Sequence, residues 1–565
     1  MPIRFSLSCT LLLGLLAAAC GSGESDPAGS GGAGGSGGAV GSGGDGGDGG
    51  DGGSGGAGGS DEPASPLVQT DKGPVEGALV GSTRTFLGIP FAAPPLGELR
   101  WKPPAPHEGW TEALKATALG PACAQSMMLT PGFDPSSSED CLTVNVWTPE
   151  RPASSSLPVL VWIYGGAFEV GSGGLPEYDG QRLSETTGSV VVTFNYRLGP
   201  LGFLALPELK EEDPDHPATG NYGLEDQRAA LAWVKANIGA FGGDPGKVTV
   251  FGESAGGISI CAHLVSPESQ GLFQRAIIES GPCDVVVPEE TAVAQGETLV
   301  EALGCSDAPA VLDCLREKSA EEVTTALPPA ADILIGDGPR WFPVIDGWNL
   351  PDVPGKLLEA GTFEKVPTIL GSNADEGTVF VAAGGTTIAD DAAFLAFAER
   401  LAPGRGEEVA AGYPSDTYGS AQEAATAALG DYFFVCPTRR AARAIAEAGV
   451  DTYLYHFTHA PEDSLFGDLG AFHSAEIRYV FGTPGTLLPA PLTEEELDLS
   501  RAIGGYWSRH AESGDPNGGD AVAWPKYDAE TDEHLVLDMT ISAQSGLRTD
   551  LCDLWDSVGA EQRRR

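Results

Sequence analysis

The chain has 565 residues, of which 79 are acidic and 32 basic, so its formal net charge is −47 at pH 7. This excess of negative charge repels phosphate groups, and it argues against nucleic acids and anionic membrane surfaces as partners. The roughly 500 residues beyond position 65 have mixed composition without a second glycine-rich break, which is long enough for one large domain with insertions.

Residues 1–19 have the features of an export signal. Arg4 precedes an apolar run from Leu11 to Leu16, which is shorter than the roughly 20 residues that span a bilayer. The small residues Ala17–Ala19 then fit the site that signal peptidases cut. Because the cut falls before Cys20, the segment resembles a bacterial lipoprotein signal, and we expect a lipid anchor on that cysteine. An ordinary secretory signal cut at the same bond is the alternative.

Residues 20–65 consist mainly of glycine with scattered serine, alanine and aspartate. These side chains cannot offset the entropy lost on ordering, so we predict a flexible tether with a reach of about 35–40 Å. Asp45, Asp48 and Asp51 recur at a regular spacing, but calcium-binding repeats of glycine and aspartate have a longer period with an apolar position. A solvated spacer is therefore the preferred interpretation.

We predict one domain over residues 66–557, followed by a charged tail over 558–565. Apolar and β-branched runs indicate buried strands at 157–164, 189–196, 247–251, 275–278, 366–371 and 452–457. Between the second and third of these, residues 223–239 carry apolar side chains at helical spacing. The alternation predicts an α/β fold with a doubly wound, mostly parallel sheet, whose sites lie at the carboxyl ends of strands.

Glycines Gly165 and Gly166, with Ala167, directly follow the first of these strands. Their bare backbone N–H groups are suited to bind the oxygen of a reacting carbonyl, together with the N–H of Ala255. A simple chain reversal is the alternative for these glycines.

A strand ends at Gly252-Glu253-Ser254-Ala255-Gly256, and a helix of small residues follows. This is the pattern of a nucleophile elbow, in which glycines allow a sharp turn and the serine hydroxyl projects from the sheet. Two further matches to the same five-residue pattern, at 34–38 and 52–56, lie in the glycine tract without a strand or helix. The context therefore selects Ser254 as the candidate nucleophile.

In folds with this elbow the catalytic histidine follows the serine in the chain, which excludes His107 and His216. His263 lies within the helix of the elbow, where a core or surface role is expected. His456 and His459 lie in or just beyond a strand pattern, and we expect no catalytic role for them. His510 and His534 are flanked by charged or polar residues, so we expect them at solvated positions without a catalytic role. His473 differs because a glycine-bearing loop leads to it, so we prefer it as the base.

Two neighbouring acids, Asp375 and Glu376, stand just after the strand at 366–371. Either could orient the histidine, and the residues themselves do not choose between them.

The chain resembles the type-B carboxylesterase and cholinesterase family of α/β-hydrolases over nearly the whole domain. The family's motifs appear in order as Phe86–Ala92, Ser138–Leu142, Tyr164–Phe168, Phe194–Arg197, Gly223–Arg228, Phe241–Pro245, Gly252–Gly257, Phe342–Gly347 and Asp375–Gly377. The resemblance implies an α/β-hydrolase fold and a triad of Ser254, Glu376 and His473. It also implies an oxyanion hole formed by the backbone N–H groups of Gly166, Ala167 and Ala255, with no metal or organic cofactor.

The resemblance further implies three disulfides: Cys123 with Cys141, Cys305 with Cys314, and Cys436 with Cys552. Cys261 and Cys283 have no partner in the family pattern, so we expect buried free thiols, with a fourth bridge as the alternative.

The function implied is a carboxylesterase that cleaves uncharged, small-molecule esters through an acyl-enzyme. A lipase acting on longer-chain acylglycerols is one alternative. A non-catalytic adhesion domain is another, disfavoured because all the triad positions are filled. Cholinesterases bind choline on a tryptophan in the loop that corresponds to the segment between Cys123 and Cys141 of this chain. This segment contains no tryptophan, and Phe133 is its one aromatic residue. Met127, Met128 and Leu129 in that loop would line the entrance to the site or pack as ordinary loop residues. The sequence leaves the oligomeric state open.

Overall fold

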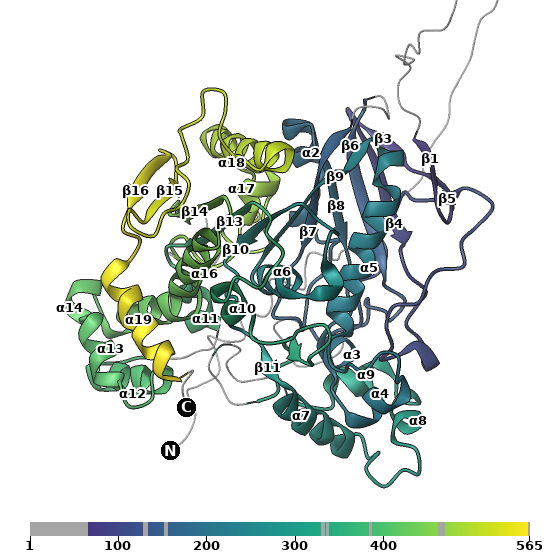
Figure 1. The fold of residues 1–565 in the computed structure, drawn as a ribbon, viewed down its shortest axis with the longest axis horizontal. Helices are drawn as coiled ribbons and strands as arrows, with labels where there is room; N and C mark the ends of the chain where they lie inside the picture. The colour runs from purple at the N-terminus through teal and green to yellow at the C-terminus, as the bar shows by residue number, and fades with distance from the viewer. Residues whose placement is uncertain are drawn as a thin grey trace, which may run out of the picture. The chain divides into compact units, whose positions relative to one another are not determined.

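The computed structural model describes residues 66–127, 134–151, 156–328, 334, 338–383, 387–461 and 469–562 (Figure 1). The expected signal peptide, the anchor at Cys20 and the glycine tether lie outside these residues and stay predictions. The last helix, α19 (Thr549–Gln562), continues through the domain boundary predicted at 557.

An 11-stranded sheet forms the centre of the domain (Figure 1). In order across the sheet its strands are β16 (Ser542–Ser545), β15 (Glu533–Leu537), β14 (Thr452–Phe457), β13 (Thr368–Asn373), β10 (Arg275–Glu279), β9 (Gly243–Glu253), β7 (Leu157–Ile163), β8 (Val190–Phe194), β6 (Thr143–Pro149), β4 (Thr83–Pro90) and β3 (Ala78–Val80). The strands from β15 to β8 are parallel to one another, whereas the pairs at both margins are antiparallel. The predicted α/β fold with a mostly parallel sheet is confirmed.

Two small sheets lie outside the central one. The first consists of β1 (Leu67–Thr70), β2 (Gly73–Glu76) and β5 (Leu114–Lys115), and the second of β11 (Val287–Pro288) and β12 (Val344–Ile345).

Helices pack on the central sheet along its length. The helices in contact with it include α2 (Gln181–Thr187), α5 (Tyr222–Asn237), α6 (Ala255–Val265), α16 (Cys436–Glu447) and α18 (Glu494–Ser513). The others are α3 (Gly199–Phe203), α4 (Pro207–Glu212), α7 (Glu289–Ala302), α8 (Val311–Arg316), α9 (Ala320–Thr325), α10 (Pro354–Glu359), α11 (Gly377–Ala383), α12 (Asp391–Leu401), α13 (Gly406–Gly412), α14 (Ser415–Tyr418), α15 (Ala421–Gly430) and α17 (Ile477–Phe481). Within the described ranges, no helix is long and apolar enough to cross a membrane.

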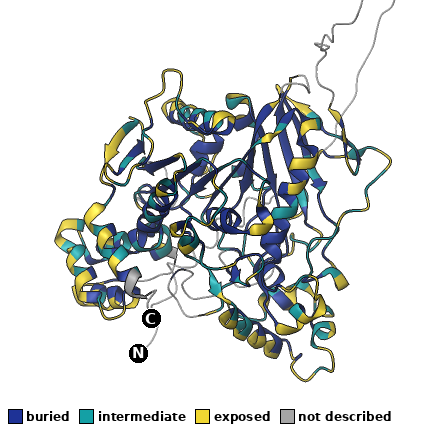
Figure 2. Cartoon of the chain, viewed as in Figure 1, coloured by how far each residue is buried: buried dark blue, intermediate teal, exposed yellow. Residues whose placement is uncertain are grey.

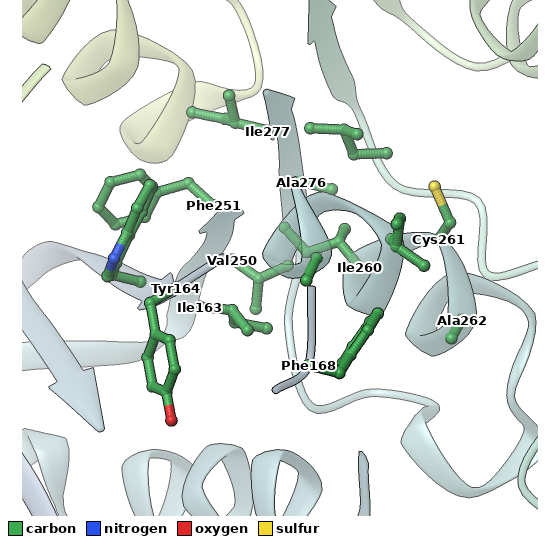
Figure 3. Packing of buried hydrophobic residues seen from close by; sticks show 14 of the residues in the cluster. Ile163, Tyr164, Phe168, Val250, Phe251, Ile260, Cys261, Ala262, Ala276 and Ile277 are labelled. Atoms are coloured by element: carbon green, nitrogen blue, oxygen red, sulfur yellow. The ribbon is translucent and has the colours of Figure 1, made fainter. Parts of the chain in front are cut away.

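The core is continuous on both faces of the central strands, which are buried over most of their length (Figure 2). Side chains alternate between the two faces of a strand. On β9, Phe251 packs against Phe481 of α17, with ring centroids 5.7 Å apart, while its neighbour Val250 lies on the side of α6 near Ile260 (Figure 3). Burial on both faces explains why these strands appear in the sequence as runs of mainly apolar and β-branched residues.

The structure contains four disulfides, and the expected free thiols at Cys261 and Cys283 are wrong. Three bridges are those implied by the family resemblance. The fourth joins Cys261 in α6 to Cys283, just after β10, with the Cα atoms 5.3 Å apart. The crossover from β9 through α6 to β10 brings these two positions together, and a bridge needs this proximity rather than any sequence spacing.

We expect loss of the Cys261–Cys283 bridge to lower the free energy of unfolding by about 3 kcal/mol, because the unfolded chain gains the freedom of a loop of about 20 residues. The double variant Cys261→Ser/Cys283→Ser, compared in urea unfolding with Cys305→Ser/Cys314→Ser, measures this loss. The second pair closes a shorter loop and is expected to cost slightly less. Wild-type stability in the first double variant would contradict a formed bridge.

Two histidines expected to be solvated are instead buried, so that expectation is wrong. His510 is 0% exposed because its side of α18 faces the sheet, and burial lowers its pKa to about 4. His534 is 4% exposed because it lies in β15. His263 has the core role, between Ser269 and Gln227. The polar sequence neighbours of His510 and His534 gave no sign of these positions, because one face of a helix or strand can be buried while the next residue is exposed.

Candidate active site

The connection between β9 and α6 is a sharp turn centred on Ser254. Its backbone has φ 54° and ψ −120°, a conformation that costs a non-glycine residue of the order of 1–3 kcal/mol. A Cβ atom on Gly256 would lie 1.9 Å from the carbonyl oxygen of Ile163, and one on Gly252 would lie 2.6 Å from it. Only glycine fits at both positions, so the geometry is that of the predicted elbow.

The same turn places Ala255 at the first position of α6. An N–H group at a helix N-terminus has no partner within the helix, and it carries the partial positive charge of the helix dipole. The Ala255 N–H therefore lies directly beside the candidate nucleophile.

His473 and Glu376 are brought together by loops that follow neighbouring elements. A parallel bridge between Asp375 and Phe472 aligns the two loops, and His473 Nδ1 lies 2.6 Å from Glu376 Oε2. Since an ionised carboxylate only accepts hydrogen bonds, the Nδ1–H group is the donor. The structure therefore brings into contact the two residues that the family resemblance pairs.

Glu376 is held in place by two further donors. Its Oε1 accepts hydrogen bonds from the hydroxyl of Ser280 at 2.6 Å and from the backbone N–H of Asn373 at 2.7 Å. The side chain is 0% exposed. Ser280, which directly follows β10, was not identified from the sequence; the one available signal was its place at the carboxyl end of a strand.

Asp375, the alternative acid, has a different partner. Its Oδ2 accepts the backbone N–H of Ala471 at 2.9 Å, which shapes the loop before His473. The two adjacent acids therefore have different partners: Glu376 bonds to His473, and Asp375 bonds to the backbone of Ala471.

His473 is 6% exposed and lies between aromatic rings. Its ring centroid is 4.4 Å from that of Phe434 and 5.0 Å from that of Phe380. Burial alone would lower the pKa of His473, but the carboxylates of Glu253 and Glu376 outweigh burial and raise the pKa above its ordinary value. Its Nε2 atom has no hydrogen-bond partner among the described residues and lies 3.0 Å from Glu253 Oε1.

The turn after β7 lies against the elbow. A Cβ atom on Gly165 would approach Cβ of Ser254 to 3.1 Å. Gly166, Ala167 and Phe168 all have positive φ, at 101°, 55° and 63°. The two hydrogen bonds that close the turn run from the N–H groups of Glu169 and Val170 to the carbonyl of Gly166, and among the described residues the N–H groups of Gly166 and Ala167 have no backbone acceptor.

Phe168 anchors this strained turn. Its side chain is buried and meets Phe203 edge to face, with the ring centroids 5.1 Å apart. Its carbonyl accepts the N–H of Gly199 at 2.7 Å. Packing of the aromatic ring thus compensates the backbone strain.

Other residues singled out in the sequence are placed as follows. Met127 is 43% exposed, and Met128, Leu129 and Phe133 lie outside the described residues. Across the described part of the chain, no group of three histidine, cysteine or acidic side chains is arranged to hold a metal ion.

The site lies at the carboxyl ends of parallel strands. It combines a strained serine elbow, a histidine bonded to a buried carboxylate, and an adjacent turn whose N–H groups face no backbone acceptor among the described residues. Together these features define the class of α/β serine hydrolases. The chain belongs to the carboxylesterase family, whose signature matches residues 64–555.

Individual relatives agree with this assignment. The chain is 38% identical to the para-nitrobenzyl esterase of Bacillus subtilis (strain 168) over 490 residues, which cover 85% of this chain and 96% of that protein. It is 36% identical to the cholinesterase of Mus musculus over 531 residues, 86% of each chain. A solved structure of a PNB esterase superimposes with a TM-score of 0.75 at 35% identity, covering 86% of this chain and 98% of that one. The protein has the α/β-hydrolase fold and is a carboxylic-ester hydrolase.

Proposed function

We propose that Ser254 is the nucleophile of this esterase, His473 its general base and Glu376 the acid that orients the histidine. The Ser254 hydroxyl attacks the ester carbonyl while its proton passes to Nε2 of His473, which then protonates the leaving alcohol. Water hydrolyses the acyl-enzyme by the same proton transfers in reverse. Loss of activity on replacement of Ser254 is the direct test.

The hydrogen bond from His473 Nδ1 to Glu376 is the observation that carries this proposal. Because Nδ1 holds the proton, Nε2 keeps its lone pair and is free to accept a proton. Glu376 also stabilises the imidazolium that forms in the transition state.

The backbone N–H groups of Gly166, Ala167 and Ala255 are proposed to bind the oxyanion of the tetrahedral intermediate. Support comes from the turn geometry, in which the first two have no backbone acceptor among the described residues, and from the position of Ala255 at the start of α6. Donors fixed before the reaction stabilise the developing charge without reorganising.

We propose uncharged esters with short to medium acyl chains as substrates, rather than choline esters. The segment between Cys123 and Cys141 contains no tryptophan, and a desolvated cation over an indole is worth about 2 kcal/mol. Loss of that contact corresponds to about 30-fold in binding. We therefore expect less than about a tenfold preference in kcat/KM for butyrylcholine over its uncharged isostere 3,3-dimethylbutyl butyrate. A larger preference for the cation would show that another part of the site binds it.

Export with a lipid anchor at Cys20 is also proposed. Four disulfides support export, because disulfides form and persist in oxidising compartments. We expect the wild-type protein to partition into detergent and Cys20→Ser to abolish this partitioning. Mass spectrometry of the mature N-terminus provides the control, since an unmodified Cys20 there would refute the anchor.

A further inference from the structure

A row of buried residues crosses four strands behind His473. In the register of the sheet, Glu253 of β9 pairs with Glu279 of β10, and Glu279 pairs with Gly371 of β13. Gly371 in turn pairs with Tyr455 of β14. Residues opposite one another on neighbouring strands project to the same face, with Cβ atoms about 5 Å apart. The two glutamates are therefore direct neighbours.

Gly371 leaves room for the tyrosine ring. A Cβ atom at this position would lie 2.1 Å from ring atoms of Tyr455, so the ring lies over the glycine. The Tyr455 hydroxyl and Glu279 Oε2 are both buried and have no hydrogen-bond partner among the described residues. Trp507 of α18 covers the row and donates its indole N–H to Glu279 Oε1 at 2.8 Å.

The two glutamates differ in the charge stabilisation they receive. Glu253 Oε1 accepts the hydroxyl of Ser474 at 2.7 Å and faces His473 at 3.0 Å. Glu279 has one neutral donor, Trp507, on one oxygen only. Adjacent carboxylates in a dry interior do not both ionise at neutral pH. Burial, with the Glu253 carboxylate adding to it, raises the pKa of Glu279 to about 8. The proton of the pair therefore resides on Glu279.

Other titratable groups surround the pair, and none supplies a positive charge to Glu279. Glu376 faces His473 from the loop after β13, Glu476 lies near both glutamates of the pair just before α17, and Glu177, Tyr178 and Tyr455 complete the set. Burial raises the pKa of Glu476 well above its ordinary value, and its Oε2 accepts the side-chain N–H of Asn373 at 2.5 Å.

We propose that Glu279 is a positioning residue of this esterase: as a neutral acid it does not repel the Glu253 carboxylate, which lies 3.0 Å from His473 Nε2 and must yield that place to the Ser254 hydroxyl. The inference rests on the proposed roles of Ser254 and His473. When Glu279 loses its proton, the adjacent carboxylates repel, and this repulsion holds Glu253 against His473 Nε2, in the place that the serine hydroxyl must take. The ionisation of Glu279 therefore switches activity off in alkali.

The test compares kcat/KM at pH 9.5 and pH 7.5 within each variant, with an uncharged ester and correction for uncatalysed hydrolysis. We expect kcat/KM of the wild type to fall about tenfold over this interval, as the interaction between close buried charges implies. In Glu279→Gln, a neutral isostere that still accepts the Trp507 N–H, kcat/KM is expected to stay constant over this interval. Glu476→Gln is the matched control, a buried neutral acid outside the strand pair, and it is expected to keep the fall.

Three outcomes overturn the inference: no fall in the wild type, an equal fall in Glu279→Gln, or loss of the fall in both variants. Labelling of Ser254 by a fluorophosphonate at pH 7.5 separates failure of the inference from failure of the proposed site. A label on another residue refutes the site, whereas a Ser254 label with unaltered pH profiles refutes only the role of Glu279.

Thermal unfolding gives a readout independent of activity. A carboxyl whose pKa is raised in the folded state retains its proton there while the unfolded chain releases it, so stability decreases as pH rises from about 4.3 to the folded pKa. The melting temperature of Glu279→Gln should therefore rise relative to the wild type between pH 5 and 8. A constant difference across this range would contradict a protonated Glu279.

Discussion

Replacement of Ser254 with alanine is expected to lower kcat for ester hydrolysis by about 10⁴- to 10⁶-fold, because the nucleophile is lost and the reaction reverts to attack by water. Binding and the oxyanion donors remain, so a small activity above the uncatalysed rate should persist. Alanine adopts the positive φ of this turn with strain similar to that of serine. The fold is therefore expected to stay intact, which circular dichroism and thermal unfolding measure.

His473→Ala provides the control for Ser254→Ala. Because the two residues act in one proton transfer, the double variant should be no slower than either single variant. A fluorophosphonate should label the wild type on Ser254 and leave Ser254→Ala unlabelled. Retention of more than about 1% of kcat in Ser254→Ala would mean that another residue is the nucleophile.

Replacement of Glu376 with glutamine is expected to lower kcat by about 10⁴-fold. The amide presents an N–H group or a neutral oxygen to His473 Nδ1, so the proton of the imidazole is no longer held there and the imidazolium loses its counter-charge. The variant replaces the carboxylate that accepts the 2.6 Å hydrogen bond from His473 Nδ1. Steady-state kinetics with an activated ester measures the effect, and KM should change little because the carboxylate does not touch the substrate.

Asp375→Asn is the matched control for this variant, since it makes the same chemical change one residue earlier. Asp375 bonds to the backbone of Ala471 and not to His473, so the loop should weaken slightly and kcat should stay within about tenfold of the wild type. The opposite result, with the larger loss in Asp375→Asn, would exchange the roles of the two acids.

The sequence alone determined most of the architecture because the central strands are buried on both faces. Strands with no solvent face appear as runs of mainly apolar and β-branched residues, and β14 has the same bounds, Thr452–Phe457, in the structure as in the sequence pattern. The elbow was equally readable, since close backbone contacts at Gly252 and Gly256 leave glycine as the one residue that fits. Steric requirements of this kind act locally and are recorded in local sequence.

The partners of buried polar groups were decided by the tertiary structure. Asp375 and Glu376 are indistinguishable by composition, and only the alignment of their loop with the loop before His473 directs Glu376 to the imidazole. The Cys261–Cys283 bridge and the burial of His510 likewise depend on which elements meet. Glu253 and Glu279 lie far apart in the chain and become neighbours through strand register. Hydrogen bonds, disulfides and charge interactions depend on distances in space, which the local sequence does not record.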